Sequence, residues 1–258
     1  MLSTVAIDIK NLTIGYKSHR QLYPVARSIN ATIRCGEVVA LVGRNGAGKS
    51  TLLRTICGYQ KALSGELSFM GRSFDGLDTK TLSKLIAVVL TDTSVASNIT
   101  VRELVSLGRT PHTNFFGSMR TADKRAVDWA MDVVGIETFS NRKIAALSDG
   151  ERQKCMIAKA LAQETPIIAL DEPTAFLDYP SKMALFRQLS HLASRMEKAV
   201  IVSTHDIELA FRLCNTIWFM DKGALHCGTP DDLWDSGVLK EFVGNDDIRF
   251  NENKKVIE

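Results

Sequence analysis

Apolar and polar positions alternate near the start of the chain and give way to short unbroken apolar runs further on. Alternation over residues 5–14 and 29–33 is typical of half-buried strands, the first of which we expect Gly15 to end. A glycine-bounded strand is predicted at residues 65–71 and a hairpin at residues 216–228. The unbroken runs are typical of strands buried on both faces, and they cover residues 38–42, 86–90, 167–170 and 199–203.

Amphipathic patterns with a helical period predict the helices. They cover residues 50–57, 79–85, 101–107, 122–134, 181–196 and 206–213. Residues 101–161 are mainly helical and lie between two buried strands, which predicts a helical subdomain inserted into an α/β core. Two half-buried strands ahead of the buried runs favour a mixed sheet. The polar residues 251–258 are expected to form a frayed tail.

The composition is that of an ordinary globular protein, with 45% hydrophobic and 24% charged residues among 258 and a formal net charge of +3. No block of lysine and arginine stands out, so nucleic acid is not an expected partner. No apolar run approaches the ~20 residues of a membrane-spanning helix, so we expect any link to a membrane to go through a partner. The five cysteines are scattered, and we expect reduced, mostly buried thiols.

The buried run at residues 38–42 leads into a glycine-rich loop and a helix. Residues 43–50 read GRNGAGKS, which matches the phosphate-loop pattern G-x-x-x-x-G-K-[ST]. Glycines let consecutive N–H groups converge on a phosphate, and the start of a helix adds partial positive charge. We expect Lys49 to reach the β- and γ-phosphates of a nucleotide and Ser50 to ligate Mg²⁺. The predicted nucleotide contacts are Gly43, Asn45, Gly46, Ala47, Gly48, Lys49, Ser50 and Thr51.

Two carboxylates, Asp171 and Glu172, end another buried run. In an α/β sheet with a phosphate loop, the carboxyl ends of the strands face the nucleotide. Asp171 is then placed to hold Mg²⁺ directly or through water. Glu172 is placed to accept a proton from the water that attacks the γ-phosphate. The alternative is a pair of solvated carboxylates at a strand end.

A helix start is predicted at residues 147–153, which read LSDGERQ. Ser148 and Glu151 have the spacing of a capping box. A helix N-terminus that carries a serine hydroxyl and a glycine, here Gly150, is also able to bind an anion. The spacing alone leaves open whether this is an anion site or simply a well-capped helix.

The order of four motifs resembles the ATP-binding cassette (ABC) family. They are GRNGAGKST at residues 43–51, LSDGE at 147–151, IIALDEPT at 167–174 and STHD at 203–206. The resemblance covers nearly the whole chain and implies a phosphate-loop NTPase fold of the ABC type, with a mixed sheet core, an antiparallel β subdomain and an inserted helical subdomain. It implies one ATPase domain over residues 1–258: a nucleotide-binding core at 1–90 and 165–245, a helical subdomain at about 91–164 and a tail at 246–258.

The resemblance also implies roles for single residues. Tyr16 resembles the aromatic residue that stacks on adenine, and residues 174–178 resemble the D-loop. His205 resembles the switch histidine that senses the γ-phosphate. Ser148 and Gly150 lie in the signature motif, which in the family closes over ATP held by the phosphate loop of a second copy, in a head-to-tail homodimer. ATP and Mg²⁺ are therefore the expected ligands.

Two positions depart from the family pattern. Thr91 stands where the Q-loop glutamine is expected, and Thr91 or Asp92 is the candidate substitute that binds water or Mg²⁺. Asp149 replaces the first glycine of the signature. A carboxylate near a triphosphate repels it, unless the carboxylate points away or caps the helix. Both departures bear on the rate of ATP hydrolysis more than on the fold.

Residues 99–112 read ITVRELVSLGRTPH and are similar to the ATPase subunits of importers for iron–siderophore, haem and cobalamin. This implies an ATP-hydrolysing subunit that works with a polytopic membrane permease and, indirectly, an extracytoplasmic substrate-binding protein. Such a subunit is peripheral, on the cytoplasmic side of the bacterial inner membrane. The alternatives are a non-transport ABC ATPase, a nucleotide-dependent switch and a transporter for another cargo.

An aromatic pair, Phe115 and Phe116, stands in the polar loop at residues 109–117. One interpretation makes the pair part of the local core of the helical subdomain. The other makes this loop part of a cleft for a short helix of the membrane subunit, with Arg109 as an exposed anchor. On the second interpretation, charge reversal at Arg109 leaves basal ATP hydrolysis nearly intact.

Overall fold

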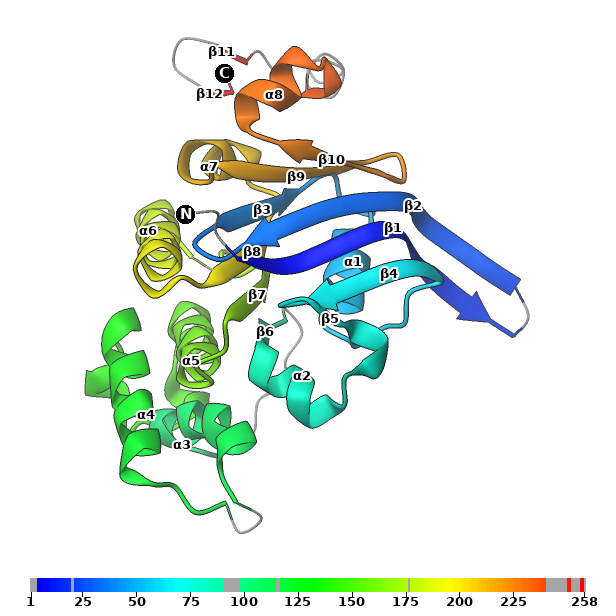
Figure 1. The fold of residues 1–258 in the computed structure, drawn as a ribbon. Coiled ribbons are helices and arrows are strands. Elements are labelled where there is room, and N and C mark those ends of the chain that lie inside the picture. Colours follow the sequence, from blue (N-terminus) through cyan, green and yellow to red (C-terminus); the bar gives the residue numbers. More distant parts are fainter. Residues whose placement is uncertain are drawn as a thin grey trace. The chain divides into compact units, whose positions relative to one another are not determined.

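The structure is a computed structural model that describes residues 4–19, 21–90, 98–114, 117–175, 177–239, 250–251 and 256–257. The chain divides into two compact units (Figure 1). The first unit contains Met1–Gly76 and Leu189–Glu258, and the second contains Leu77–Gln188. The domain boundaries drawn from the motifs stay a prediction.

The first unit contains an antiparallel sheet with the strand order β2-β1-β4-β5. Its strands are β1 (Val5–Ser18), β2 (Gln21–Arg34), β4 (Ser64–Phe69) and β5 (Arg72–Ser73). The expectation that Gly15 ends β1 is wrong, because the ladder continues through Gly15 opposite Pro24 as far as Ser18 opposite Gln21. A register shift at Ile14/Gly15 interrupts the alternation, and such a bulge hides a continuing strand from a pattern of period two.

The same unit contains a second group of strands, in the order β10-β9-β3-β8. β3 (Val38–Val42) pairs in parallel with both β8 (Ala199–Ser203) and β9 (Thr216–Asp221), and β9 pairs antiparallel with β10 (Ala224–Gly228). Every residue of β3 and β8 is buried, as their unbroken apolar runs predict. The predicted mixed sheet is confirmed, but its antiparallel member is β10, whereas β1 and β2 belong to the other sheet.

The helices of the first unit follow its strands. They are α1 (Lys49–Ile56), α7 (Ile207–Leu213) and α8 (Pro230–Asp235), together with the 3₁₀ turn η1 (Phe74–Gly76). The helix α6 (Tyr179–Met196) begins in the second unit and ends in the first. The expected frayed tail is wrong for part of its length, because β11 (Phe250–Asn251) pairs antiparallel with β12 (Val256–Ile257). Main-chain pairing of this kind does not depend on a run of apolar side chains.

The second unit combines two parallel strands, β6 (Ile86–Val89) and β7 (Ile167–Asp171), with the predicted helical region. Its α-helices are α2 (Thr79–Leu85), α3 (Val101–Ser106), α4 (Thr121–Val134) and α5 (Asp149–Ala162). The described part of this unit also contains the 3₁₀ helices η2 (Leu107–His112), η3 (Glu137–Phe139) and η4 (Ile144–Ala146). α3, α4 and α5 pack against one another (Figure 1). None of the helices in the described ranges is long and apolar enough to cross a membrane.

Local sequence signals explain where these helices begin and end. Thr100 and Glu103 form a capping box at the start of α3, as Ser148 and Glu151 do at the start of α5. α4 ends at Gly135, whose φ of 69° is the left-handed conformation typical of a helix C-terminus. These boundaries lie within one residue of those that the sequence predicts.

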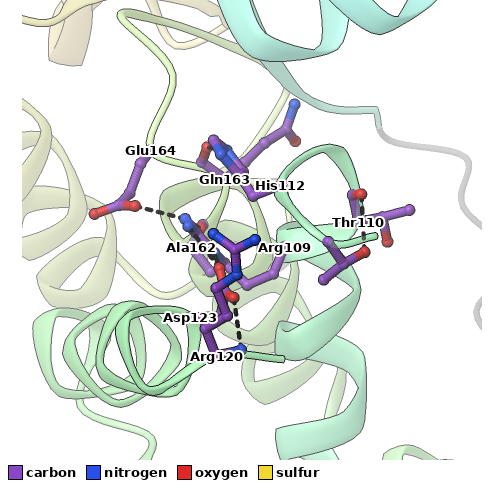
Figure 2. Close-up of polar contacts among 9 residues, drawn as sticks. Arg109, Thr110, His112, Arg120, Asp123, Ala162, Gln163 and Glu164 are labelled. Atoms are coloured by element: carbon purple, nitrogen blue, oxygen red, sulfur yellow. Dashed lines mark hydrogen bonds and ion pairs between the residues drawn. The ribbon is translucent and has the colours of Figure 1, made fainter. Parts of the chain in front are cut away.

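The prediction that Arg109 is an exposed anchor is wrong, because the residue is only 4% exposed and lies inside the second unit (Figure 2). Its guanidinium donates from Nε to Oδ1 of Asp123 at 3.0 Å, and Nη2 lies 2.9 Å from the same oxygen. Nη1 lies 2.6 Å from both the Ala162 carbonyl oxygen and Oε2 of Glu164. Arg109 is therefore not an exposed anchor for a partner. Phe115 and Phe116, the other residues of that hypothesis, lie outside the described residues.

We predict that Arg109→Met destabilises the protein by about 3–5 kcal/mol, because it leaves the buried Asp123 carboxylate without its cation. The matched control is Arg102→Met, which breaks an ion pair to Asp128 on the surface of the same unit, where Arg102 is 47% exposed. That change should cost no more than about 1 kcal/mol. Urea unfolding measures both free energies. Equal losses for the two variants would contradict the buried placement of Arg109.

Candidate functional site

The loop between β3 and α1 is shaped by close contact with strand β9. A Cβ atom at Gly43 would overlap the main-chain carbonyl oxygen of Met220. At Gly48, where φ is +106°, a Cβ would lie 2.5 Å from Cγ1 of Val25 and 2.9 Å from Cε of Met220. At Gly43 the overlap is with the main chain, so only glycine fits there. At Gly48 the close atoms belong to side chains, and the positive φ adds to the preference for glycine.

Lys49 is buried at the base of this loop. Its Nζ donates to the carbonyl oxygens of Gly43 at 2.8 Å and Arg44 at 3.3 Å. The ammonium group therefore lies inside the curve of the loop. Since α1 begins at Lys49 with no acidic residue in its first turn, the cation and the helix N-terminus favour an anion at the same place.

The remaining predicted contacts follow the loop in order. Asn45 and Gly46 are exposed at its crest, Ala47 and Ser50 are half-buried, and Thr51 is buried. Tyr16 of β1 lies beside Thr51, with 2.9 Å between the phenol oxygen and Oγ1 of Thr51. The tyrosine side chain is 51% exposed, which leaves part of the ring accessible to a ligand.

His205 belongs to the same unit and follows the strand next to β3. Leu41 of β3 pairs with Ser203 of β8, and the Thr204 amide donates to the Leu41 carbonyl oxygen at 3.0 Å. The carboxyl ends of the two strands are therefore neighbours, with the phosphate loop after one and the exposed His205 after the other. In open α/β sheets this is the edge at which ligands bind.

The second unit carries the paired carboxylates at the end of β7. Asp171 is 4% exposed, and Glu172 is half-buried with a φ of 48°. A residue other than glycine in this left-handed region is uncommon and occurs often at functional sites. β7 therefore ends at the buried carboxylate of Asp171, and the next residue, Glu172, has a left-handed backbone conformation. Thr91 and Asp92, the predicted Q-loop substitutes, and Phe176 of the D-loop lie outside the described residues.

The start of α5 carries the signature residues in a defined arrangement. The Ser148 hydroxyl donates to Oε2 of Glu151 at 2.9 Å and accepts from the Glu151 amide at 3.3 Å. The hydrogen bond from the Ser148 amide lowers the pKa of the Glu151 carboxyl. Asp149 is exposed and pairs with Nη2 of Arg152 at 2.9 Å, which offsets the charge that replaces a signature glycine. Gly150 follows within the first turn of the helix.

Sequence reasoning missed Met220 and Val25, which support the phosphate loop. The two fixed glycines were the available signal, since each marks a place where another chain segment approaches closely. The segments that approach, β2 and β9, are distant from the loop in the sequence, so only the structure identifies them.

The comparisons with known proteins agree with this geometry. The family model for ABC transporters matches residues 26–175. The iron(3+)-hydroxamate import ATP-binding protein FhuC of Bacillus subtilis is 33% identical over 88% of this chain and 86% of its own length. The cobalamin import ATP-binding protein BtuD of Halobacterium salinarum is 36% identical over 95% of this chain, which spans 58% of that relative.

Solved structures give the same picture. An ABC transporter assigned to the metal-chelate type, in an inward-facing conformation, superposes with a TM-score of 0.78 at 25% identity, over 92% of this chain and 89% of the other. The dimeric structure of MJ0796, a bacterial ABC transporter cassette, superposes with a TM-score of 0.77 at 29% identity, over 86% and 98%. The chain therefore belongs to the ABC transporter family, as its ATP-hydrolysing subunit, and the predicted fold class is confirmed.

We predict that Lys49→Ala weakens ATP binding by about tenfold to a hundredfold, because it removes a charge-assisted hydrogen bond to the phosphates. Lys61→Ala is the matched control, since Lys61 is an exposed lysine of the same unit outside the loop. Isothermal titration calorimetry gives both affinities. An unchanged affinity for Lys49→Ala would show that this loop does not hold the triphosphate.

Proposed function

We propose that the chain is the ATPase subunit of an importer for metal chelates such as iron–siderophore, haem or cobalamin. The observation that carries this proposal is the similarity to relatives named for cobalamin import and for iron(3+)-hydroxamate import, at 36% and 33% identity. These two cargoes share a metal ion held in an organic ligand. The structural likeness to a transporter of the metal-chelate type supports the same class.

ATP binding is proposed to use the phosphate loop and its neighbours. The amides of the loop and Nζ of Lys49 bind the phosphates, while Tyr16 stacks on the adenine ring. Mg²⁺ takes oxygen ligands and is usually held by one or two side chains together with substrate phosphates. The Ser50 hydroxyl and the buried Asp171 carboxylate fit that preference, with Thr91 as a third candidate from the sequence. Bound there, Mg²⁺ would neutralise charge on the phosphates.

Hydrolysis is proposed to depend on groups at two strand ends. Glu172 accepts the proton of the attacking water, and His205 contacts the γ-phosphate. Ser148 and Gly150 complete the site from a second copy of the chain in a head-to-tail homodimer. The dimeric structure of the MJ0796 cassette supports such an assembly.

Transport is proposed to follow from closing and opening of this dimer. The cassettes then move polytopic membrane permease subunits, which receive cargo from an extracytoplasmic substrate-binding protein. In this arrangement the chain is a peripheral protein on the cytoplasmic side of the bacterial cell membrane.

A second candidate function is a nucleotide-dependent switch with little turnover. Asp149 in the signature and Thr91 in place of the glutamine favour it. The ion pair between Asp149 and Arg152 weakens this alternative, because a paired carboxylate repels a triphosphate less than an unpaired one. The ATPase subunit therefore remains the better account.

We predict that Glu172→Gln lowers the rate of ATP hydrolysis about a hundredfold or more and leaves ATP affinity unchanged, because it removes the base and keeps the shape of the side chain. Size-exclusion chromatography with Mg-ATP should then show a stable dimer. Glu137→Gln, at an exposed glutamate of the second unit, is the control. A wild-type rate in Glu172→Gln would exclude this residue as the base.

Cargo uptake tests the proposed transport function. In a strain that lacks the gene, uptake of radiolabelled iron(3+)-hydroxamate, haem or cobalamin should fall and should return with the wild-type chain. Lys49→Ala should not restore it, because the variant cannot bind ATP tightly. If uptake of all three chelates is unaffected by deletion, the proposed cargo class is wrong.

A further inference from the structure

The C-terminal end of the signature helix α5 is held by the 3₁₀ helix η2. The backbone of η2 passes so close to α5 that a Cβ at Gly108 would overlap the Lys159 carbonyl oxygen. Next in the chain, Nη1 of Arg109 donates to the Ala162 carbonyl oxygen at 2.6 Å. His112 follows, with Nε2 2.9 Å from the Gln163 carbonyl oxygen. η2 thus supplies partners for carbonyl groups that the end of a helix leaves unmet.

Arg109 joins this helix end to the beginning of another helix. Asp123, its buried partner, lies in the first turn of α4, and Oδ2 of Asp123 accepts the Arg120 amide at 2.9 Å. That backbone hydrogen bond lowers the pKa of the Asp123 carboxyl. The carboxylate at the start of α4 and the guanidinium at the end of α5 each have the sign that the respective helix dipole favours. One buried ion pair therefore fixes two helix ends and η2 together (Figure 2).

The end of α5 is also tied to the strand side of the second unit. Nε2 of Gln163 donates to the Ser83 carbonyl oxygen at 2.6 Å and to that of Ile86 at 3.2 Å. These carbonyls lie where α2 gives way to β6. The helix end is thus fixed on several sides by hydrogen bonds, of which those from Arg109 and Gln163 are partly or fully buried and the one from His112 is exposed.

The opposite end of α5 carries the signature. The 14 residues of this helix span about 21 Å, at 1.5 Å per residue. Its start is closed by the Ser148–Glu151 capping box, and Nη2 of Arg142 donates to the Ala146 carbonyl oxygen just before it. Because α5 is capped at its start and held by hydrogen bonds at its end, we expect it to reorient as one rigid body. A small change in its direction at Ala162 would then displace Ser148 and Gly150.

We propose that Arg109 is a positioning residue for ATP hydrolysis, which sets the direction of α5 and so the place at which the signature meets the nucleotide of the second copy. This inference rests on the proposed function. Arg109 is far along the chain from the phosphate loop and belongs to the other unit. Its loss should therefore lower turnover while binding of ATP to the phosphate loop persists.

The test is Arg109→Lys, which keeps the charge. A single ammonium group cannot replace the fork that spans Asp123, Ala162 and Glu164. The matched control is Arg102→Lys, the same substitution at an exposed ion pair that also involves α4. Both purified full-length variants are assayed below their melting temperatures, which circular dichroism gives. We expect kcat of Arg109→Lys to fall about tenfold to a hundredfold, with the Kd for a fluorescent ATP analogue within about twofold of wild type.

Arg102→Lys should keep both values within about twofold of wild type. If Arg109→Lys does not fold, His112→Ala replaces it, since it removes one exposed hydrogen bond to the same helix end and should lower kcat with an unchanged Kd. A folded variant with wild-type kcat, or one in which Kd weakens as much as kcat falls, overturns the inference. A wild-type protein without ATPase activity would instead overturn the proposed function, which keeps the two failures distinct.

Discussion

The contact between the phosphate loop and strand β9 is the constraint on which the nucleotide site depends. Met220 lies against the loop at both Gly43 and Gly48, and Val25 of β2 closes the second position. At Gly43 a Cβ would overlap the main chain of Met220, so the loop backbone lies directly against β9. Within this loop Nζ of Lys49 donates to the carbonyl oxygens of Gly43 and Arg44. Parallel pairing of β3 with β8 then brings His205 to the same edge. A buried sheet thus holds a short polar loop in a fixed shape.

The groups that we propose for ATP binding and hydrolysis are divided between the two units of the chain. The phosphate loop, Tyr16 and His205 belong to the first, whereas Asp171, Glu172 and the signature belong to the second. In the second unit the buried ion pair between Arg109 and Asp123 fixes the helix ends around it. Packing against β9 fixes the phosphate loop of the first unit in the same sense. An ion pair buried in this way adds little net stability but specifies one arrangement, since any other leaves a charge without a partner. That property suits the role proposed for α5, in which the helix presents Ser148 in one direction.

The sequence predicted the elements whose signals are local. The apolar runs of β3, β7 and β8 and the capping box of α5 all needed only neighbouring residues. It failed where partners are distant in the chain. Asp123 and Glu164 lie 14 and 55 residues after Arg109, so nothing in the loop sequence showed that this arginine is buried. The bulge at Gly15 was missed because it breaks the alternation that defines a strand. The phosphate loop was recognisable from its motif, but its support by Met220 was not.

The most direct test of the central constraint is the ATP affinity of Gly48→Ala compared with Gly71→Ala. Both glycines have positive φ, +106° and +75°, so both substitutions strain the backbone. A Cβ at Gly71 meets no atom within 4 Å, whereas one at Gly48 meets Val25 and Met220. Calorimetry should show ATP binding weakened by at least about tenfold, or about 1.4 kcal/mol, in Gly48→Ala and unchanged in Gly71→Ala. Wild-type affinity in a folded Gly48→Ala variant would contradict the claim that packing on β9 shapes the nucleotide site.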